Sequence, residues 1–163
     1  MTLPDLITTQ GTELPLWDLA TVTAIRAGER MPQWHPDFPR EDDRGAAGLW
    51  HEGDPWGPRS IVVRDWVVGS IGFFGPPQPA PDGQPEVEVG YGLVPTGRGR
   101  GIVPEALGAL LALTDGLGVR VRASIAPDNR SSLRVAAKLG FTDIRGTTDH
   151  GELVLVRPVV SGG

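Results

Sequence analysis

The stretch TGRGRGIVPEAL, residues 96–107, places three glycines and two arginines within six residues and then turns apolar. It follows EVEVGYGLV, residues 86–94, where large apolar residues alternate with glutamate and glycine, as in a strand with one side free of large apolar groups. After it, apolar residues recur at helical spacing as far as Leu117, and Pro104 fits the first turn of a helix. The stretch therefore predicts a strand, a glycine-rich turn and an amphipathic helix in direct succession.

Alternating and helical patterns continue on both sides of this centre. They predict strands at 6–9, 59–64, 66–74, 86–94, 119–126, from Phe141 and at 151–158, and helices at 16–27, 41–50, 103–117 and 129–140. The prolines of 75–85 exclude a central strand there. The expected fold class is a mixed α/β sheet with helices on its faces, in a single domain.

Composition narrows the classes of function. A chain of 163 residues with 39% hydrophobic residues can bury one core. The absence of cysteine excludes a disulfide framework and a cysteine nucleophile, and the three histidines lie at no metal-ligand spacing, so no metal cofactor is expected. Because no apolar run approaches the roughly 18 residues of a membrane span and the first residues do not resemble a signal peptide, we expect a cytoplasmic protein with no membrane partner.

Charge is uneven along the chain. Residues 1–58 carry ten acids and four arginines, whereas residues 97–134 carry six arginines and three acids. This asymmetry favours two binding surfaces of opposite preference, or two solvated faces. The net charge of −5 and the end of the basic region in the middle of the chain argue against a nucleic-acid partner.

The glycine–arginine turn allows three interpretations: a loose surface turn, an RG-type RNA-binding segment, or a cradle for a phosphate-bearing cofactor. Its position between a strand and a helix excludes a disordered RG segment. No lysine completes a P-loop, and no register supplies G-x-G-x-x-G. A turn that exposes main-chain N–H groups at a helix N-terminus binds anions, and Arg98 and Arg100 add formal charge, so a diphosphate group fits.

A family resemblance adds to this interpretation. GYGLVPTGRGRGIVPEAL, residues 90–107, followed by NRSSLRVAAKLGF, residues 129–141, resembles the GNAT superfamily of N-acetyltransferases, and most closely its RimJ/RimL-like branch, which acetylates ribosomal proteins. The resemblance covers roughly residues 86–141. It implies a GNAT-like, mostly antiparallel sheet that splays in the middle and is flanked by about four helices.

The resemblance also implies acetyl-CoA as cosubstrate. The glycine–arginine turn would hold its pyrophosphate, the end of the preceding strand would contact the pantetheine arm, and the motif asparagine would touch that arm or only cap its helix. The residues matched to these contacts are Leu93, Val94, Arg98, Gly99, Arg100, Gly101, Ile102 and Asn129. One departure is Val103, where the family usually has a smaller residue.

Within a single acetyltransferase domain at 1–163 we expect three parts. Residues 1–58 would form acceptor-side helices and loops, 59–141 the sheet and acetyl-CoA site, and 142–163 a C-terminal hairpin. As a general base we expect Glu88, which shares a strand side with Glu86; the alternative is an edge carboxylate that is solvated or paired to an arginine. Because Ala136 stands where many members carry a tyrosine acid, Ser132 is the expected substitute, or else a capping residue.

We expect Trp34 and His150 to contact the acceptor. Further tryptophans and the acids Glu41, Asp42 and Asp43 would line the same side, since aromatic faces and carboxylates suit a cationic amine. The expected function is direct acetyl transfer in a ternary complex to a primary amine, either a protein N-terminus or a small cationic amine. The chain would act as a monomer or homodimer. The alternative is a non-catalytic acyl-CoA-binding or ribosome-associated module with the same fold.

Overall fold

The computed structural model describes residues 2–161. Strands within that range are β1 (Leu6–Thr8), β2 (Glu13–Pro15), β3 (Arg59–Val63), β4 (Trp66–Phe73), β5 (Gln78–Pro79), β6 (Pro85–Leu93), β7 (Arg120–Ile125), β8 (Asp143–Thr147) and β9 (Leu153–Arg157). The helices are α1 (Leu19–Ala27), α2 (Glu41–Gly48), α3 (Ile102–Leu117) and α4 (Arg130–Lys138), with a 3₁₀ turn, η1, at Pro95–Gly97. This content confirms the expected mixed α/β class.

The strands follow the order β1-β2-β3-β4-β6-β7-β9-β8, with β5 paired to β6. The pairing of β6 with β7 is parallel and that of the outer strands antiparallel, which agrees with the mostly antiparallel sheet expected. A parallel pair needs a long crossover, and α3 supplies it. The register of β6 with β7 runs from Glu86 opposite Arg120 to Glu88 opposite Arg122.

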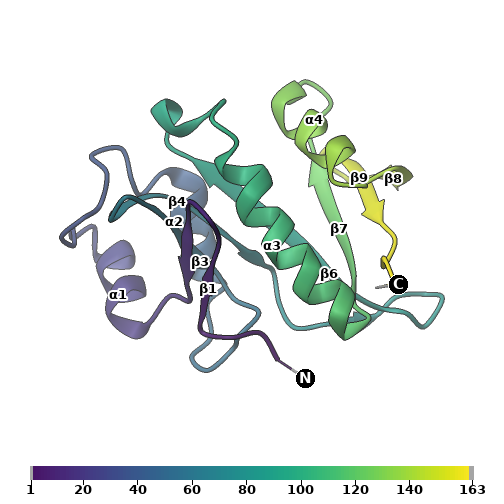
Figure 1. Cartoon of the computed structure of the whole chain (residues 1–163), viewed down its shortest axis with the longest axis horizontal. Helices are drawn as coiled ribbons and strands as arrows, with labels where there is room; N and C mark the ends of the chain where they lie inside the picture. The colour runs from purple at the N-terminus through teal and green to yellow at the C-terminus, as the bar shows by residue number, and fades with distance from the viewer. Residues whose placement is uncertain (1, 162–163) are drawn as a thin grey trace. The chain divides into compact units, whose positions relative to one another are not determined.

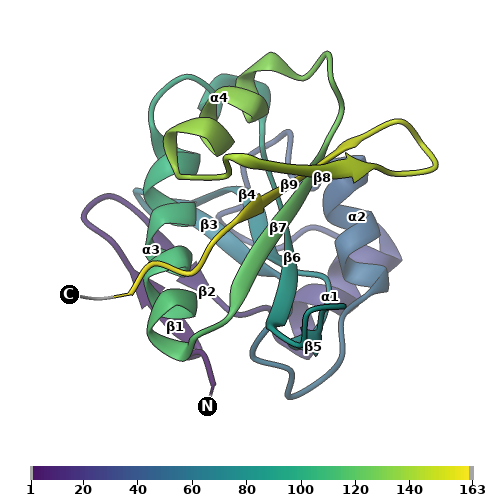
Figure 2. The ribbon, with the colours of Figure 1, turned by 90° about the vertical axis from the view of Figure 1, so that its right-hand side faces the viewer.

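Two compact units make up the described chain. Unit 1 comprises the described residues up to Pro76 together with Gly90–Ala109; in it α1 and α2 lie side by side (Figure 1). Unit 2 comprises Pro77–Val89 and the described residues from Leu110 onward; in it β9 lies between β7 and β8, and α4 packs on β7 (Figure 2). Each has buried apolar side chains, among them Phe38 and Ile61 in unit 1 and Val121 in unit 2.

The long helix begins and ends where the sequence predicts. Pro104 lies in its first turn, and Gly118 follows its last residue with a φ of 70°, in the left-handed conformation that ends many helices. Leu107, Leu110 and Leu111 are almost fully buried. The apolar residues spaced along 103–117 are therefore buried as the pattern predicts, Leu107 in unit 1 and Leu110 and Leu111 in unit 2.

Several predicted boundaries are wrong for local reasons. The helix predicted at 16–27 begins only at Leu19, because the Asp18 side chain caps it by accepting from Thr21 N–H at 2.8 Å. Leu16, which follows β2, instead forms an isolated bridge with Arg59. The helix predicted at 41–50 ends at Gly48. The strand predicted from Phe141 starts at Asp143, since Phe141 is buried against the end of α4 and its N–H donates to Ala136 O.

No helix among the described residues is long and apolar enough to cross a membrane.

Candidate active site

The turn between β6 and α3 is built from a few main-chain hydrogen bonds in unit 1. Val94 N–H donates to Val68 O at 2.8 Å, and Gly97 N–H returns to Val94 O at 2.9 Å. Gly99 and Gly101 then adopt φ values of 76° and 77°, which side chains other than glycine rarely tolerate. These two glycines turn the chain into α3, so their spacing in the sequence has a conformational cause.

The start of α3 leaves a run of main-chain donors without partners. The first helical hydrogen bond is from Glu105 N–H to Gly101 O at 3.2 Å. Within residues 2–161 the five N–H groups of Gly99–Val103 donate to no acceptor, main-chain or side-chain. A helix start normally leaves its first N–H groups unpaired, and this turn extends the run by three residues. The result is a set of donors at the positive end of a 16-residue helix.

Formal charge strengthens the same surface. Arg98 and Arg100 are exposed, and neither makes an ion pair with a described residue. Arg98 Nε donates to Leu93 O at 3.3 Å, which ties its stem to the end of β6. The one acid in the first turn, Glu105, accepts from Gly11 N–H at 3.0 Å. The turn and helix start therefore combine free N–H donors with two uncompensated guanidinium groups, as an anionic ligand such as a diphosphate requires.

The main-chain groups expected to meet a cofactor arm are already in use. Leu93 O accepts from the Arg98 side chain, Val94 N–H donates to Val68 O, and Val94 O accepts from Gly97 N–H. A carbonyl oxygen has two lone pairs, so further contact at these residues would use the second one.

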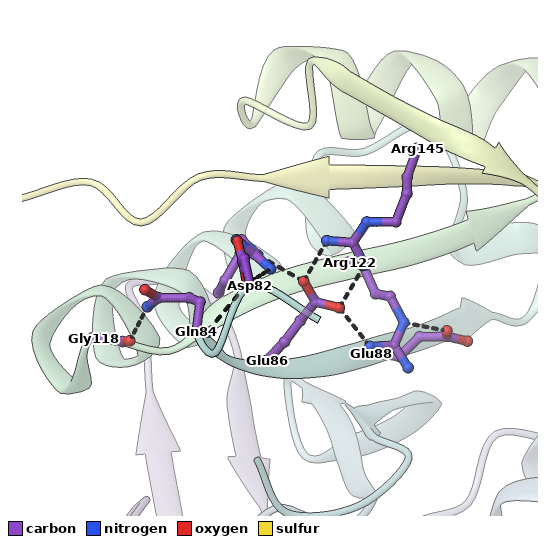
Figure 3. Close-up of polar contacts among 8 residues, drawn as sticks. Asp82, Gln84, Glu86, Glu88, Gly118, Arg122 and Arg145 are labelled. Carbon is purple, nitrogen blue, oxygen red and sulfur yellow. Dashed lines mark hydrogen bonds and ion pairs between the residues drawn. The ribbon is translucent and has the colours of Figure 1, made fainter. Parts of the chain in front are cut away.

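In unit 2 a buried carboxylate organises a chain of charged groups on β6, β7 and β8. The Glu86 side chain is 2% exposed and accepts from Arg120, Arg122 and Arg145 at 2.6–2.7 Å (Figure 3). Arg145 binds it with both Nη atoms; an irregularity in the register at Ile144 and Gly146 makes Arg145 an extra residue in β8, and such bulges redirect side chains. Hydrogen bonds from Arg145 and the other two arginines lower the pKa of Glu86 to about 2, although burial opposes this shift.

The expected base, Glu88, continues this chain. Its side chain is 22% exposed, and Oε1 accepts from Arg122 Nε at 3.0 Å, while Arg122 Nη1 donates to Glu86 (Figure 3). Arg122 lies opposite Glu88 in the parallel register of β6 and β7. The sequence left open whether the Glu88 carboxylate is solvated or paired to an arginine, and in the structure it is paired to Arg122. Charged residues occupy every second position in both EVEV, residues 86–89, and VRVRAS, residues 119–124. If the two segments are paired as neighbouring strands, this alternation predicts the glutamate–arginine pairs.

The remaining candidates of unit 2 lie in α4 and in the turn between β8 and β9. Asn129 caps α4, because its Oδ1 accepts from Ser132 N–H and from Ser131 Oγ, both at 3.2 Å. The Ser132 side chain is half-buried in the first turn of the helix. His150 is exposed, and its main-chain N–H donates to Thr148 Oγ1 at 3.3 Å.

On the acceptor side of unit 1, Trp34 is 6% exposed and packs edge-on against Phe38, while the Arg30 guanidinium lies 5.9 Å from its ring centroid. Asp43 is fully buried and accepts from Ser70 Oγ and from Arg40 N–H. The acidic wall expected there therefore lacks Asp43, whereas Glu41 and Asp42 are exposed.

The glycine side of β6, predicted to be free of large side chains, is covered in unit 1 by residues from other elements. The Phe74 ring lies over Gly90, and the Arg40 guanidinium lies over Gly92. Sequence reasoning did not identify Arg40 or Phe74, because no local pattern places them there. Among the described residues no group of three or more His, Cys, Asp or Glu side chains could hold a metal ion.

Comparison with known proteins identifies the family of the chain. The family model described as acetyltransferase (GNAT) domain matches residues 13–142. No curated protein matches the chain.

Solved structures share the fold. An acetyltransferase from Agrobacterium tumefaciens str. C58 is 24% identical, with 96% of this chain and 95% of that chain covered and a TM-score of 0.66. RimL, a ribosomal L7/L12 alpha-N-protein acetyltransferase in complex with coenzyme A, is 20% identical, with 94% and 98% covered and a TM-score of 0.65. RimJ from Mycobacterium smegmatis in complex with CoA-disulfide is 20% identical, with 96% and 86% covered and a TM-score of 0.60.

Acetyltransferases with this fold use acetyl-CoA, and the free N–H groups at the start of α3 are chemically suited to its pyrophosphate. The family match extends well beyond residues 86–141, on which the resemblance rested, and spans most of the sequence. The chain therefore belongs to the GNAT acetyltransferase family and is an acyltransferase.

Proposed function

We propose that the protein transfers the acetyl group of acetyl-CoA directly to a primary amine in a ternary complex, the amine being a protein N-terminus or a small cationic amine. The observation that carries the proposal is the run of five N–H groups at Gly99–Val103 without acceptors within residues 2–161, beside the unpaired charges of Arg98 and Arg100. The likeness to RimL, named as a protein alpha-N-acetyltransferase, supports a protein N-terminus as one acceptor.

In this proposal the turn at Arg98–Ile102 holds the pyrophosphate chiefly through main-chain N–H groups. The macrodipole of α3 favours negative charge at this end, and the two arginines add charge-assisted hydrogen bonds. Leu93 and Val94 would contact the pantetheine arm through carbonyl oxygens, and Asn129 through its amide nitrogen, since its Oδ1 already caps α4.

Acetyl-CoA, when bound, supplies an activated acetyl thioester. The acceptor must lose a proton, because a primary amine with a pKa of about 10 is mostly protonated at pH 7. We assign that role to Glu88, directly or through water, with Arg122 fixing Oε1 and so leaving Oε2 to approach the amine. We assign to Ser132 the hydroxyl that donates a proton to the leaving thiolate, with Trp34 and His150 as acceptor-side residues.

The cradle is tested by isothermal titration of acetyl-CoA into the purified protein and the double variant Arg98→Ala, Arg100→Ala. Loss of two charge-assisted contacts should weaken binding by about 10- to 100-fold, with a smaller dependence on salt in the variant. Arg44→Ala, which removes an exposed arginine of α2 that makes no ion pair among the described residues, is the matched control. Unchanged affinity in the double variant would refute the cradle.

The transfer step is tested separately by following CoA release with an amine panel. Glu88→Gln should lower kcat by about 100-fold or more and alter the pH profile while acetyl-CoA affinity stays the same. Full activity in Glu88→Gln would assign the base elsewhere. Acetyl-CoA binding without CoA release from any amine would favour the non-catalytic acyl-CoA-binding module.

A further inference from the structure

The side of β6 that carries Gly90 and Gly92 is closed in unit 1 by one aromatic ring and one guanidinium group. A Cβ atom added to Gly90 would lie 2.7 Å from Cζ of Phe74, and one added to Gly92 would overlap Nη2 of Arg40 and lie 2.9 Å from its Nη1. Both contacts are closer than side chains can approach, so a side chain at either position would have to displace the Phe74 ring or the Arg40 guanidinium. Phe74 is nonetheless 51% exposed, and its ring is therefore an accessible apolar surface.

Arg40 is held in this position from the start of α2. Its main-chain N–H donates to Asp43 Oδ2 at 2.8 Å, and its Nη2 lies 3.5 Å from Asp43 Oδ1. The Asp43 carboxylate is fully buried, and Ser70 Oγ of β4 also donates to it. Asp43 therefore accepts from two neutral donors, the Arg40 main-chain N–H and the Ser70 hydroxyl, and also forms an ion pair with the Arg40 guanidinium.

The guanidinium itself is poorly satisfied. Its Nε is buried and makes no hydrogen bond with a described residue, although it lies 3.4 Å from Asp43 Oδ2. Nη1 has no hydrogen-bond partner within residues 2–161, and the one bond of Nη2 is at the long limit. Only 19% of the side chain is exposed. Of its three nitrogens, Nε is the one that is buried without a hydrogen bond to a described residue, so Nη1 is open to water or to a ligand. A partly buried guanidinium with unused donors is an unusual arrangement that an anionic ligand would explain.

We propose that Arg40 binds a carboxylate carried by the acceptor amine, a step that rests on the proposed acetyl transfer. Gly92, which it covers, directly precedes Leu93 and Val94, the residues assigned to the cofactor arm. A polycationic acceptor at this side of β6 would meet a like charge, whereas a carboxylate would complete the planar fork of the guanidinium with two hydrogen bonds. The favoured acceptor is an amino acid, or a peptide whose first residues are acidic, rather than a polyamine.

The test compares matched acceptors that differ only in the carboxylate. CoA release is measured with a panel of L-amino acids against their amides, and with peptides of acidic against amide-bearing N-terminal residues, so that the two sources of carboxylate are distinguished. Arg40→Ala should raise KM for the carboxylate member of the pair about 10- to 100-fold and change KM for the amide less than about twofold. KM for acetyl-CoA should not change, and Arg40→Lys should recover only part of the loss.

A second variant keeps the charge. Gly92→Ala places a methyl group against the guanidinium and displaces it, so it should raise the same KM without removing Arg40. Thermal unfolding of both variants checks the fold, and Arg44→Ala is the control expected to change neither acceptor.

Binding without turnover separates this proposal from the proposed function. In the presence of CoA, N-acetylglycine should bind the wild type about tenfold or more tighter than N-acetylglycinamide, and Arg40→Ala should abolish the difference. Loss of that difference in the variant without detectable turnover of any amine would support the carboxylate site while contradicting the transfer reaction. Turnover of amines with equal KM for acids and amides, or an Arg40→Ala variant equal to the wild type in both assays, would overturn the carboxylate site alone.

Discussion

Replacing Glu86 by glutamine tests whether one buried carboxylate holds the charged groups of β6, β7 and β8 together. Its pKa falls from 4.5 to about 2 in the folded protein, and each pH unit of that interval is worth about 1.4 kcal/mol. The ceiling is therefore about 3 kcal/mol. Because Arg122 and Arg145 are 35% and 39% exposed, solvent screening reduces the expected contribution to about 2 kcal/mol. Glu86→Gln at pH 7 should cost about that much stability.

The pH dependence follows from the direction of the shift. A carboxyl group whose pKa is lower in the folded state stabilises the protein fully above its ordinary pKa of 4.5, and this stabilisation is lost as the pH falls toward about 2. Urea unfolding at pH 7, 5 and 3.5 should therefore show a wild-type advantage over Glu86→Gln that is constant at the two higher values and smaller at pH 3.5.

The matched control is Glu52→Gln, an exposed glutamate that makes no ion pair with a described residue, and it should change stability by less than about 0.5 kcal/mol. A Glu86→Gln variant as stable as the wild type at pH 7, or a stability difference that does not shrink at pH 3.5, would refute the reasoning. Glu86→Gln also removes one ion-pair partner of Arg122, which binds Glu88 as well. Because Glu88 is the proposed base, we expect kcat to change in this variant too.

Three further predictions concern single contacts. Gly99→Ala places a side chain at a φ of 76°, although no described residue lies within 4 Å of the added Cβ atom. The free energy of unfolding measured with urea should therefore fall by about 1 kcal/mol, and titration should show weaker acetyl-CoA binding. Asp115 binds Arg157 with both oxygens at 2.7 and 2.9 Å, which lowers the pKa of Asp115; Asp115→Asn should cost about 1–2 kcal/mol at pH 7 and progressively less in acid. Arg59, 1% exposed, donates to three main-chain carbonyls, so Arg59→Met should lower the thermal midpoint by several degrees, the loss being about 2 kcal/mol.

Most of the regular structure could be predicted because its signals are local. The apolar spacing after Pro104 and the glycine at 118 define α3 at both ends, and the alternation of residues 119–126 defines β7. The two strands that were missed, β2 and β5, are three and two residues long and end in proline. Segments that short have no periodicity to detect, and their pairing depends on neighbours distant in the sequence.

The charged groups of unit 2 show where sequence reasoning stops. Alternation places Glu86 and Glu88 on one side of their strand, but it does not predict that Glu86 is buried among three arginines. Arg145 reaches the Glu86 carboxylate from β8, where it is an extra residue at an irregularity in the register. A bulge changes which side of a strand a side chain takes, and no pattern within five residues predicts it.

The acceptor side shows the same limit with a consequence for specificity. The glycines at 90 and 92 leave their side of β6 without large apolar groups of its own, as the sequence predicts, but no local pattern shows that Arg40 fills part of that side. Counting acids in the first 58 residues favoured a cationic acceptor, but the charge that a ligand meets depends on burial: Asp43 is inside, with its oxygens bound, while the guanidinium beside it keeps unused donors. Electrostatic preference at a site depends on which charged groups are buried and which donors remain unused. Among the described residues near Gly92, Arg40 forms an ion pair with the buried Asp43 and still has unused donors, which is why a carboxylate-bearing amine is the acceptor to test first.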